Sequence, residues 1–243
     1  MLRAAERVVV LTGAGISAES GIPTFRGPDG LWRTYRPEDL ATPLAFSRDP
    51  RLVWEWYDWR RQRLAAAEPN PGHRAIRELE ELAPRFTLIT QNVDGLHQAA
   101  GSRDVVELHG NIWRVRCTLE GSVSELRDVP LPELPPHCPS CGHLLRPDVV
   151  WFGEMVPTDA LQQSSHAANR ADVIVVAGTS AAVYPAASLP VLTKQAGGHL
   201  IEVNPDETLL TPIADISFRG SAGSILPQVV HAMRSLNATP KPS

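Results

Sequence analysis

A glycine-rich turn is the first part of this sequence whose residue types and spacing suit a chemical task. It follows a β-branched run directly and reads Gly13-Ala14-Gly15-Ile16-Ser17-Ala18. The pattern G-x-G-x-x-[G/A] is typical of dinucleotide binding, because the missing β-carbons let backbone N–H groups approach a pyrophosphate. The alternative is a tight strand-to-helix turn that binds nothing. The turn therefore marks a candidate phosphate-binding site.

The residues after this turn argue against a dehydrogenase. In a hydride-transferring enzyme of this type, the turn opens a helix that leads to a second strand ending in Asp or Glu. Here the helix is interrupted by Gly21, Pro23, Gly27, Pro28 and Gly30, and a long loop follows. Loops of that length in compact domains are usually functional.

The three cysteines form a second candidate site. Cys138-x-x-Cys141 in a chain with an odd, small cysteine count indicates a metal site in a reducing compartment rather than disulfides. A zinc ribbon expects two such pairs, but Cys117 is followed three positions later by Glu120 instead of a fourth thiolate. The fourth zinc ligand is left open among Glu120, His137 and His143. The alternative is three small structural thiols without metal.

Short β-branched runs predict the strands that position these groups. They cover residues 8–12, 86–90, 105–108, 173–177 and 200–203, with a weaker run at 216–218. Continuous apolar runs are typical of parallel strands that are covered on both faces. Helix-like stretches lie between several of them, at 73–82, 159–169 and 186–195. The alternation predicts an α/β fold with a Rossmann-like, doubly wound parallel sheet.

Two stretches interrupt this alternation: a Trp-rich segment at 31–67 and a Pro-rich segment at 113–146 that holds all three cysteines. We interpret them as an inserted smaller module, part helical and part similar to a zinc ribbon. The predicted division is a Rossmann-like nucleotide-binding domain of residues 1–30, 84–112 and 147–236, and a module of residues 31–83 and 113–146. Residues 237–243 are expected to be a frayed tail, because they offer little apolar surface.

Composition restricts the class of protein. The 243 residues are 43% hydrophobic and 21% charged with a net charge of −4, which fits one domain, or one with an insert, and argues against nucleic-acid binding. No apolar run approaches the ~18 residues of a membrane span, and the N-terminal residues leave no room for a signal peptide. We expect a cytoplasmic, monomeric protein that does not bind membranes.

Longer motifs carry a family resemblance. The glycine-rich turn extends through Glu19-Ser20-Gly21-Ile22-Pro23-Thr24-Phe25-Arg26-Gly27, and the further runs are Gly30-Leu31-Trp32, Thr90-Gln91-Asn92-Val93-Asp94-Gly95-Leu96-His97, His109-Gly110, Val149-Val150-Trp151-Phe152-Gly153-Glu154, Gly178-Thr179-Ser180 and Asn204-Pro205. In this order, across nearly the whole chain, they resemble the sirtuins, which are NAD-dependent protein-lysine deacylases. The resemblance implies that NAD is consumed as a co-substrate and that the partner is an acylated lysine in a protein.

The resemblance also implies a reaction. An acyl-lysine oxygen attacks C1′ of the nicotinamide ribose, nicotinamide leaves, and a base activates a ribose hydroxyl toward the resulting imidate, giving free lysine and O-acyl-ADP-ribose. Such a base must be a neutral imidazole near pH 7. His109 follows a predicted strand at the edge where open α/β sheets bind ligands, and it is the predicted catalytic base. His97 is the competitor, although most histidines are structural.

Cofactor contacts are assigned by the same resemblance. Amide and carboxylate groups suit ribose hydroxyls and the carboxamide, and an aromatic ring and a guanidinium in the long loop suit shielding and phosphate binding. As isolated features, many of these residues would form ordinary strand-end or Asx-type turns. The predicted cofactor-binding residues are Gly13, Ala14, Gly15, Ser17, Ala18, Phe25, Arg26, Trp32, Gln91, Asn92, Asp94, Gly178, Thr179, Ser180, Asn204, Pro205, Asp206 and Ala222.

Tyr57 and Arg60 indicate which acyl group the protein prefers. Three residues apart on a helix, they share a face, so a hydroxyl and a guanidinium can converge on one anion. The pair resembles the Tyr-x-x-Arg of class III sirtuins, which prefer succinyl-, malonyl- or glutaryl-lysine. The alternative is an amphipathic helix with Trp54, Tyr57 and Arg61 packed on the core. Residues 149–154 are expected to be an extended segment that pairs with substrate backbone through Val150, Trp151, Phe152 and Gly153, or a buried strand without a partner.

The sequence thus predicts an NAD-dependent protein deacylase that favours acidic acyl groups, with several alternatives open. A general deacetylase would use the same residues without the acyl preference. A mono-ADP-ribosyltransferase would capture C1′ with a protein side chain, and nicotinamide release would then not depend on an acyl-peptide. An NAD-sensing module would bind NAD without releasing nicotinamide, since fold alone does not fix function.

Overall fold

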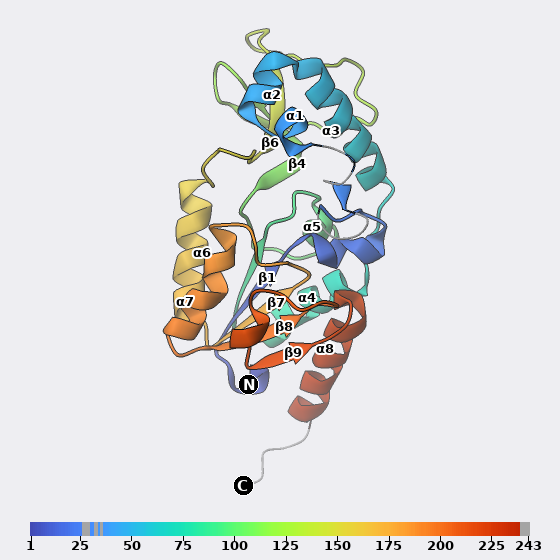
Figure 1. The fold of residues 1–243 in the computed structure, drawn as a ribbon. Helices are drawn as coiled ribbons and strands as arrows, with labels where there is room; N and C mark the ends of the chain where they lie inside the picture. Colours follow the sequence, from blue (N-terminus) through green and yellow to red (C-terminus); the bar gives the residue numbers. More distant parts are fainter. Residues whose placement is uncertain (26–29, 32–33, 35, 239–243) are drawn as a thin grey trace.

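The computed structural model describes residues 1–25, 30, 31, 34 and 36–238, with side chains described only to residue 235 at the C-terminal end. Its main element is a six-stranded sheet in the order β3-β2-β1-β7-β8-β9, and every neighbouring pair is parallel (Figure 1). The strands are β1 Arg7–Thr12, β2 Arg85–Thr90, β3 Val105–Glu107, β7 Val173–Ala177, β8 His199–Val203 and β9 Ile216–Phe218. This confirms the Rossmann-like α/β fold.

Helices cover both faces of this sheet, which explains why its strands are apolar on both sides. In β1, Val8 and Val10 face a cluster with α4 (Pro71–Leu82) and α8 (Ala222–Ala238). Val9 and Leu11 face the opposite cluster with α6 (Thr158–Arg170) and α7 (Leu189–Gln195). Successive side chains of a strand point to opposite faces, so both faces of the sheet are buried.

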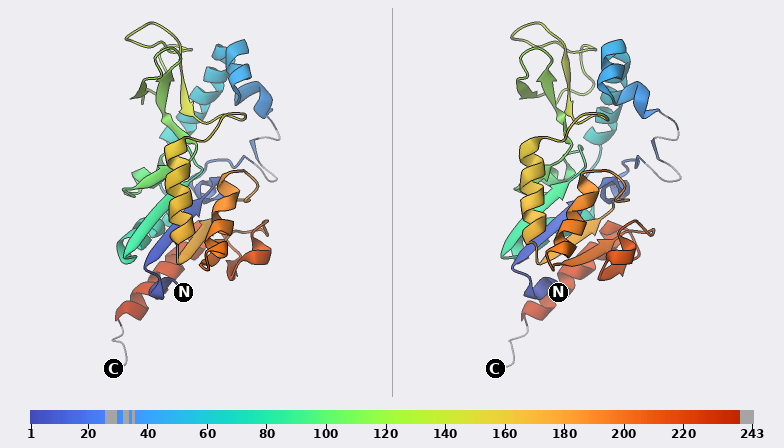
Figure 2. Two further views of the ribbon diagram at one scale, coloured as in Figure 1. Left: turned by 90° about the vertical axis from the view of Figure 1, so that its left-hand side faces the viewer. Right: turned by 60° about the vertical axis from the view of Figure 1, so that its left-hand side comes forward.

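A smaller module lies beyond the carboxyl ends of the parallel strands (Figures 1 and 2). Its antiparallel sheet has the order β5-β4-β6. The strands are β4 Gly110–Cys117, β5 Val123–Glu125 and β6 Leu145–Val149, and the helices are α1 Pro37–Leu40, α2 Pro43–Arg48 and α3 Pro50–Ala65. They share one apolar core that contains Trp54, Cys117 and Trp151.

The predicted domain boundaries stay a prediction. One helix of the segment assigned to the small module, α4, packs on the large sheet instead. Residues 31–83 were assigned to the inserted module, but α4 packs its Ile76 and Leu79 on the large sheet. At the other end, α8 reaches Ala238, two residues into the segment expected to be frayed. None of the helices in the described part of the chain is long and apolar enough to cross a membrane. The short elements are η1 Leu2–Ala4, η2 Ala14–Ser20, α5 Leu96–Ala99, η4 Ala186–Ser188 and η5 Thr211–Ile213.

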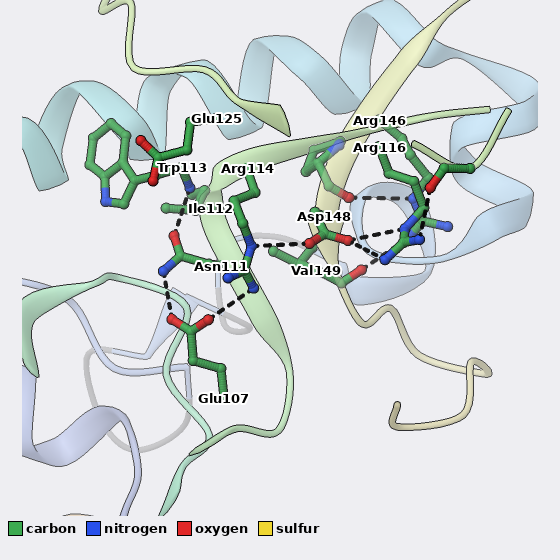
Figure 3. Close-up of polar contacts among 12 residues, drawn as sticks. Glu107, Asn111, Ile112, Trp113, Arg114, Arg116, Glu125, Arg146, Asp148 and Val149 are labelled. Carbon is green, nitrogen blue, oxygen red and sulfur yellow. Dashed lines mark hydrogen bonds and ion pairs between the residues drawn. The ribbon is translucent and has the colours of Figure 1, made fainter. Parts of the chain in front are cut away.

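A polar network fastens the small module to the large sheet (Figure 3). Glu107, the last residue of β3, accepts a hydrogen bond from Asn111 at 2.6 Å and pairs with Arg114 of β4 at 2.9 Å. Arg114 also reaches Asp148 of β6 at 3.2 Å, and Arg116 reaches the other oxygen of Asp148 at 2.7 Å. Both carboxylates are mostly shielded, so these bonds are screened less than surface ion pairs. They fix β4 and β6 of the module next to the loop that carries His109.

Candidate functional site

A cavity of about 1030 Å³ is lined by residues from both parts of the molecule. One part of its wall comes from the turn after β1 and from the loops after β2, β3, β7 and β8. The other comes from α3 and from the segment after β6. The predicted residues that line it are Gly13, Ala14, Gly15, Ala18, Phe25, Tyr57, Arg60, Gln91, Asn92, His109, Val150, Trp151, Phe152, Gly153, Gly178, Thr179, Ser180, Asn204, Pro205 and Asp206.

The glycine-rich turn lies against the loop after β7. Gly15 N–H donates to the carbonyl of Gly178 at 2.8 Å. A β-carbon on Gly15 would lie 2.7 Å from that oxygen, and one on Gly13 would lie 2.7 Å from the β-carbon of Thr179. Gly178 itself has a φ of +63°. The absent side chains therefore allow two loops to touch, in addition to the approach of a ligand that the sequence pattern predicts.

Side chains at the strand ends tie these loops together. Gln91, after β2, donates to the hydroxyl of Thr179 at 3.0 Å. Asn204, after β8, donates through its amide nitrogen to the carbonyl of Thr179 at 3.0 Å. Asn92 donates to the carbonyl of Gly13 at 3.1 Å. Amide side chains from the loops after β2 and β8 thus hold the wall in place. No described residue donates to the side-chain oxygens of Gln91 and Asn204, which leaves them available to a ligand.

Three predicted cofactor residues lie behind this wall. Ser17 is buried and donates its hydroxyl proton to the carboxylate of Asp94 at 2.8 Å. Asp94 also accepts from the backbone of Leu96 at 2.9 Å, and burial raises the pKa of its carboxyl against these bonds. Ala222 is buried at the start of α8. Since none of the three is among the lining residues, direct cofactor contact stays a prediction for them.

The carboxylate of Glu19 occupies the start of α8. It accepts from the hydroxyl of Ser221 at 2.9 Å and from the backbone N–H of Gly223 at 2.7 Å. Free N–H groups at a helix N-terminus are a common anion-binding site. Here a side chain from the glycine-rich turn already fills that role.

His109 lies in the cavity wall with one ring nitrogen oriented and the other available. Its Nδ1 is 2.9 Å from the carbonyl of Gln91, so Nδ1 carries the proton and donates. Nε2 has no hydrogen-bond partner within the described ranges. Burial lowers the pKa of His109 below its usual value, and the Gln91 carbonyl opposes this shift only partly. At neutral pH the ring therefore offers an unprotonated Nε2 to the cavity, as a general base requires.

His97, the competitor from the sequence, is buried outside the cavity lining. Its Nε2 lies 2.9 Å from the hydroxyl of Thr12, and its ring meets that of His73 edge-on at 4.9 Å between centroids. Burial lowers the pKa of His97 to about 3 and that of His73 to about 4. Both rings are neutral at physiological pH and enclosed by protein, which is the structural role that the sequence left open for His97.

Tyr57 and Arg60 lie on the shared face of α3 that their spacing predicts, and this face lines the cavity. The guanidinium carbon of Arg60 lies 5.0 Å from the ring centroid of Phe25, 4.9 Å from that of Trp56 and 5.6 Å from that of Tyr57. Three aromatic rings thus surround a cation. No described residue forms a hydrogen bond or an ion pair with this guanidinium. Burial lowers the pKa of Arg60, but a guanidinium stays charged, so an unpaired cation faces the cavity.

The rest of α3 follows the alternative interpretation of the helix. Arg61 is completely buried and donates to the carbonyls of Ile112, Leu126 and Asp128. Trp54 is also completely buried and donates to the carbonyl of Leu145 at 2.7 Å. One face of α3 is therefore structural, while the neighbouring face forms the cavity wall.

The segment at 149–154 differs from the expected extended strand. β6 ends at Val149, and the next residues form a turn in which Glu154 N–H donates to the carbonyl of Trp151 at 3.0 Å. Gly153, with a φ of +87°, makes this turn possible. The N–H groups of Val150 and Phe152 already donate to the carbonyls of His109 and Ala41. The expectation of an extended segment over 149–154 is therefore wrong for residues 151–154, because they turn and bond within the chain. Contact of Val150, Trp151, Phe152 and Gly153 with substrate stays a prediction.

The three cysteines gather as the sequence predicts, together with a carboxylate. Ligand atoms of Cys117, Glu120, Cys138 and Cys141 all lie within 4.8 Å of one another, and the sulfurs of Cys117 and Cys141 are 3.4 Å apart. Three thiols and one carboxylate oxygen at this spacing fit a tetrahedral zinc ion. Neither histidine that was weighed as a fourth ligand belongs to the group: Nδ1 of His137 pairs with Glu133, and that of His143 lies near the carbonyl of Cys141.

Two predicted cofactor residues, Arg26 and Trp32, lie outside the described residues. Other lining residues were not predicted at all. They include the exposed side chains of Met155 and Tyr184, as well as Trp56, Val93 and Glu154. Trp56 was recognisable as a neighbour of Tyr57, and Met155 as the residue after the Val149–Glu154 motif. No local pattern marks Tyr184.

Comparison with known proteins identifies the family of this chain. A model of the Sir2 family matches residues 13–185. An NAD-dependent protein deacylase of Aquifex aeolicus is 58% identical over 227 residues, which are 93% of this chain and 95% of that protein. NAD-dependent protein deacylase 1 of Archaeoglobus fulgidus is 58% identical over 228 residues, 93% of each.

Solved structures agree as well. A Sir2 homologue in complex with NAD matches with a TM-score of 0.92 and 55% identity, covering 97% of this chain and 92% of that one. A Sir2 structure with a p53 peptide and NAD⁺ matches with a TM-score of 0.87 and 35% identity, covering 98% and 96%. The fold, the cavity and both kinds of comparison agree, and this chain belongs to the Sir2 family.

Proposed function

We propose that this NAD-dependent protein deacylase prefers lysines whose acyl group ends in a carboxylate, such as succinyl-, malonyl- or glutaryl-lysine. The deacylase activity itself rests on family membership and on relatives that are 58% identical to this chain over 227 and 228 aligned residues. NAD is the co-substrate, and acylated lysines in proteins are the partners. A cytoplasmic, monomeric protein remains our expectation from the sequence.

The unpaired guanidinium of Arg60 is the observation that carries the acyl preference. A buried donor that lacks an acceptor costs roughly 1–3 kcal/mol, and a bound carboxylate removes that cost. An acetyl group ends in a methyl group and leaves Arg60 unpaired. Tyr57 lies beside it with a hydroxyl, so a carboxylate in this corner of the cavity would gain a charged and a neutral hydrogen bond.

We further propose that His109 is the catalytic base. Its unprotonated Nε2 faces the cavity, and Nδ1–H on the Gln91 carbonyl fixes the ring and the tautomer. Nε2 would take the proton from a ribose hydroxyl of the bound NAD, which activates that hydroxyl toward the acyl group. The strand-end loops with Gly13, Gly178 and Asn204 would hold the dinucleotide.

The cysteine group would hold a structural zinc ion with Glu120 as the fourth ligand. Zinc bound by four protein groups keeps no open position for chemistry, so its role would be to stabilise the small module. A Cys₃Glu site is expected to be weaker and more sensitive to acid than a Cys₄ site, because a carboxylate is a poorer zinc ligand than a thiolate.

Nicotinamide release from one peptide in an acetyl-lysine and a succinyl-lysine version tests the acyl preference, with wild type and Arg60→Met. We expect the succinyl peptide to be turned over faster by wild type. In Arg60→Met, its kcat/KM should fall about tenfold to a few hundredfold while acetyl turnover survives.

Three outcomes would speak against this proposal. Equal rates on both peptides, unchanged by the substitution, would make the chain a general deacetylase. Nicotinamide release without any acyl-peptide would favour ADP-ribosyl transfer. NAD binding with no release at all would favour an NAD-sensing module.

A further inference from the structure

Trp151 contacts the hydroxyl of Tyr57 directly. Its indole Nε1–H donates to the Tyr57 oxygen at 2.9 Å, and both side chains are only 3% exposed. A phenol has one proton to donate and lone pairs with which to accept. Because Trp151 fills a lone pair, the proton of Tyr57 must point elsewhere. No described residue accepts it.

The direction left for that proton is the cavity. Tyr57 and Arg60 both line it, and the guanidinium lies 5.6 Å from the Tyr57 ring. Burial raises the pKa of Tyr57, so the phenol stays protonated and remains a donor at neutral pH. Two buried donors without acceptors therefore face the same space. This arrangement matches the two oxygens of a carboxylate.

The indole itself is held from several sides. The guanidinium carbon of Arg146 lies 3.6 Å from the centroid of the Trp151 ring, and the ring of Phe46 lies 5.3 Å away. Arg146 also bonds to both carboxylate oxygens of Glu154, at 2.5 and 2.9 Å. The Glu154 carboxylate accepts from the backbone N–H of Trp151 at 2.8 Å. The ring is thus fixed by a stacked cation whose charge is neutralised within the same turn.

We propose that Trp151 is a positioning residue that sets acyl specificity by directing the hydroxyl proton of Tyr57 toward the carboxylate of the acyl group. A neutral acetyl methyl group cannot use that proton. Trp151 therefore matters for the choice between acyl groups rather than for the reaction with NAD. The inference rests on the acidic-acyl preference proposed above and adds a third residue to it, from a different part of the chain.

Trp151→Phe tests this role, since it keeps an aromatic ring for Arg146 and Phe46 but removes the N–H. The readout is the ratio of kcat/KM for succinyl and acetyl versions of one peptide. A general loss of activity lowers both values and leaves the ratio unchanged. We expect the ratio to fall about threefold to tenfold, mainly through KM of the succinyl peptide, as for the loss of one oriented hydrogen bond.

A double-mutant cycle with Tyr57→Phe tests whether Trp151 acts through the hydroxyl. In the Tyr57→Phe background, Trp151→Phe should leave the ratio unchanged, because there is no proton left to direct. Trp59→Phe is the matched control, since Trp59 lies on the same helix as Tyr57 but not in the cavity lining. It should leave the ratio at the wild-type value.

The two proposals fail in different ways. If wild type prefers the succinyl peptide and Arg60→Met removes that preference, but Trp151→Phe keeps it, the role of Trp151 is overturned and the acyl preference stands. A further drop of the ratio in the Tyr57→Phe background would also overturn it. If wild type shows no succinyl preference, both proposals are wrong.

Discussion

The cofactor end of the cavity, formed by the loops that carry Gly15, Gly178 and Asn204, is closed by bonds within the protein. Loop carbonyls accept from loop N–H groups, and amide side chains link one loop to the next. The acyl end, formed by Tyr57, Arg60 and Trp151, is different. There a guanidinium and a phenolic proton have no acceptor in the described part of the chain.

Because of this difference, we expect the cofactor end to contribute to the binding of every substrate and the acyl end to the selection among them. A wall whose loops are already bonded to one another is preorganised and loses little conformational freedom when a ligand binds. A wall with unpaired donors penalises any ligand that brings no acceptor, and that penalty is what discriminates between substrates. Changes at the cofactor end should therefore affect all acyl peptides alike, whereas changes at the acyl end should alter their ratio.

Replacing His109 by alanine should have the largest effect. We expect formation of deacylated peptide to fall by about 10²–10⁴ for acetyl and succinyl peptides alike, because the base acts on the ribose and not on the acyl chain. The ratio of the two kcat/KM values should stay at the wild-type value. His166→Ala, at an exposed position of α6, is the control. A loss confined to one peptide would break the distinction between the two ends.

Removing the metal should disturb the acyl end first. Cys117, Cys138, Tyr57 and Trp151 share one apolar core, so a loosened metal site loosens the acyl wall as well. Chelation should lower the succinyl-to-acetyl ratio before NAD binding is lost. Peptide kinetics and NAD titration on the same chelated sample measure the two effects.

Glu120→Ala tests directly whether Glu120 is a zinc ligand. Loss of a direct ligand should weaken zinc binding by about tenfold or more, since groups that merely orient ligands are worth about 10–100-fold. Competition with a chromophoric chelator measures the affinity, and elemental analysis gives the zinc content. Glu133→Ala, whose carboxylate pairs with His137 at 3.2 Å outside the group, is the control. Equal affinities would exclude Glu120 as a ligand.

Acidification should lower the free energy of unfolding through two buried histidines at the cofactor end. The folded-state pKa values of His97 and His73 are about 3 and about 4, below the usual value of 6.5. The unfolded chain therefore binds more protons on acidification below pH 6.5. The contribution of the two neutral rings to the free energy of unfolding is complete above that pH. Below it, the free energy of unfolding should fall by about 1.4 kcal/mol per pH unit for each ring, down to about pH 4.

Denaturant titrations at pH 7, 6 and 5 measure this slope. Replacing His97 by asparagine should make the slope shallower, whatever it does to stability at pH 7. If the variant shows the same slope of unfolding free energy against pH as wild type, His97 is not a buried, neutral histidine in the folded protein. The acid limb of kcat/KM should lie below pH 6.5, because burial also lowers the pKa of His109.

Local patterns were sufficient to predict the large sheet. Each β-branched run became a strand, and the runs at 173–177 and 216–218 match β7 and β9 residue for residue. Helical spacing also predicted that Tyr57 and Arg60 share a helix face, and strand-end position placed His109 at the ligand-binding edge of the sheet; only the family resemblance assigned the three to one site. These features depend on neighbours in the sequence, so the sequence alone carries them.

Contacts between distant segments could not be predicted in this way. Trp151 and Tyr57 are 94 residues apart, and no local pattern pairs them. Residues 149–154 were expected to be extended, but the hydrogen bond from the Phe152 N–H to the Ala41 carbonyl is a tertiary contact that no local pattern predicts. The packing of α4 on the large sheet likewise depends on α8, which lies at the other end of the chain.

Glu19 gives the molecule a built-in counter-ion. Its carboxylate on Ser221 and Gly223 neutralises the positive end of the α8 dipole whether or not a dinucleotide is present. The helix therefore does not depend on a phosphate for its stability, and the cofactor can leave without exposing an uncompensated charge. An enzyme that consumes its dinucleotide in every turnover must be stable while empty, and this carboxylate contributes to that stability.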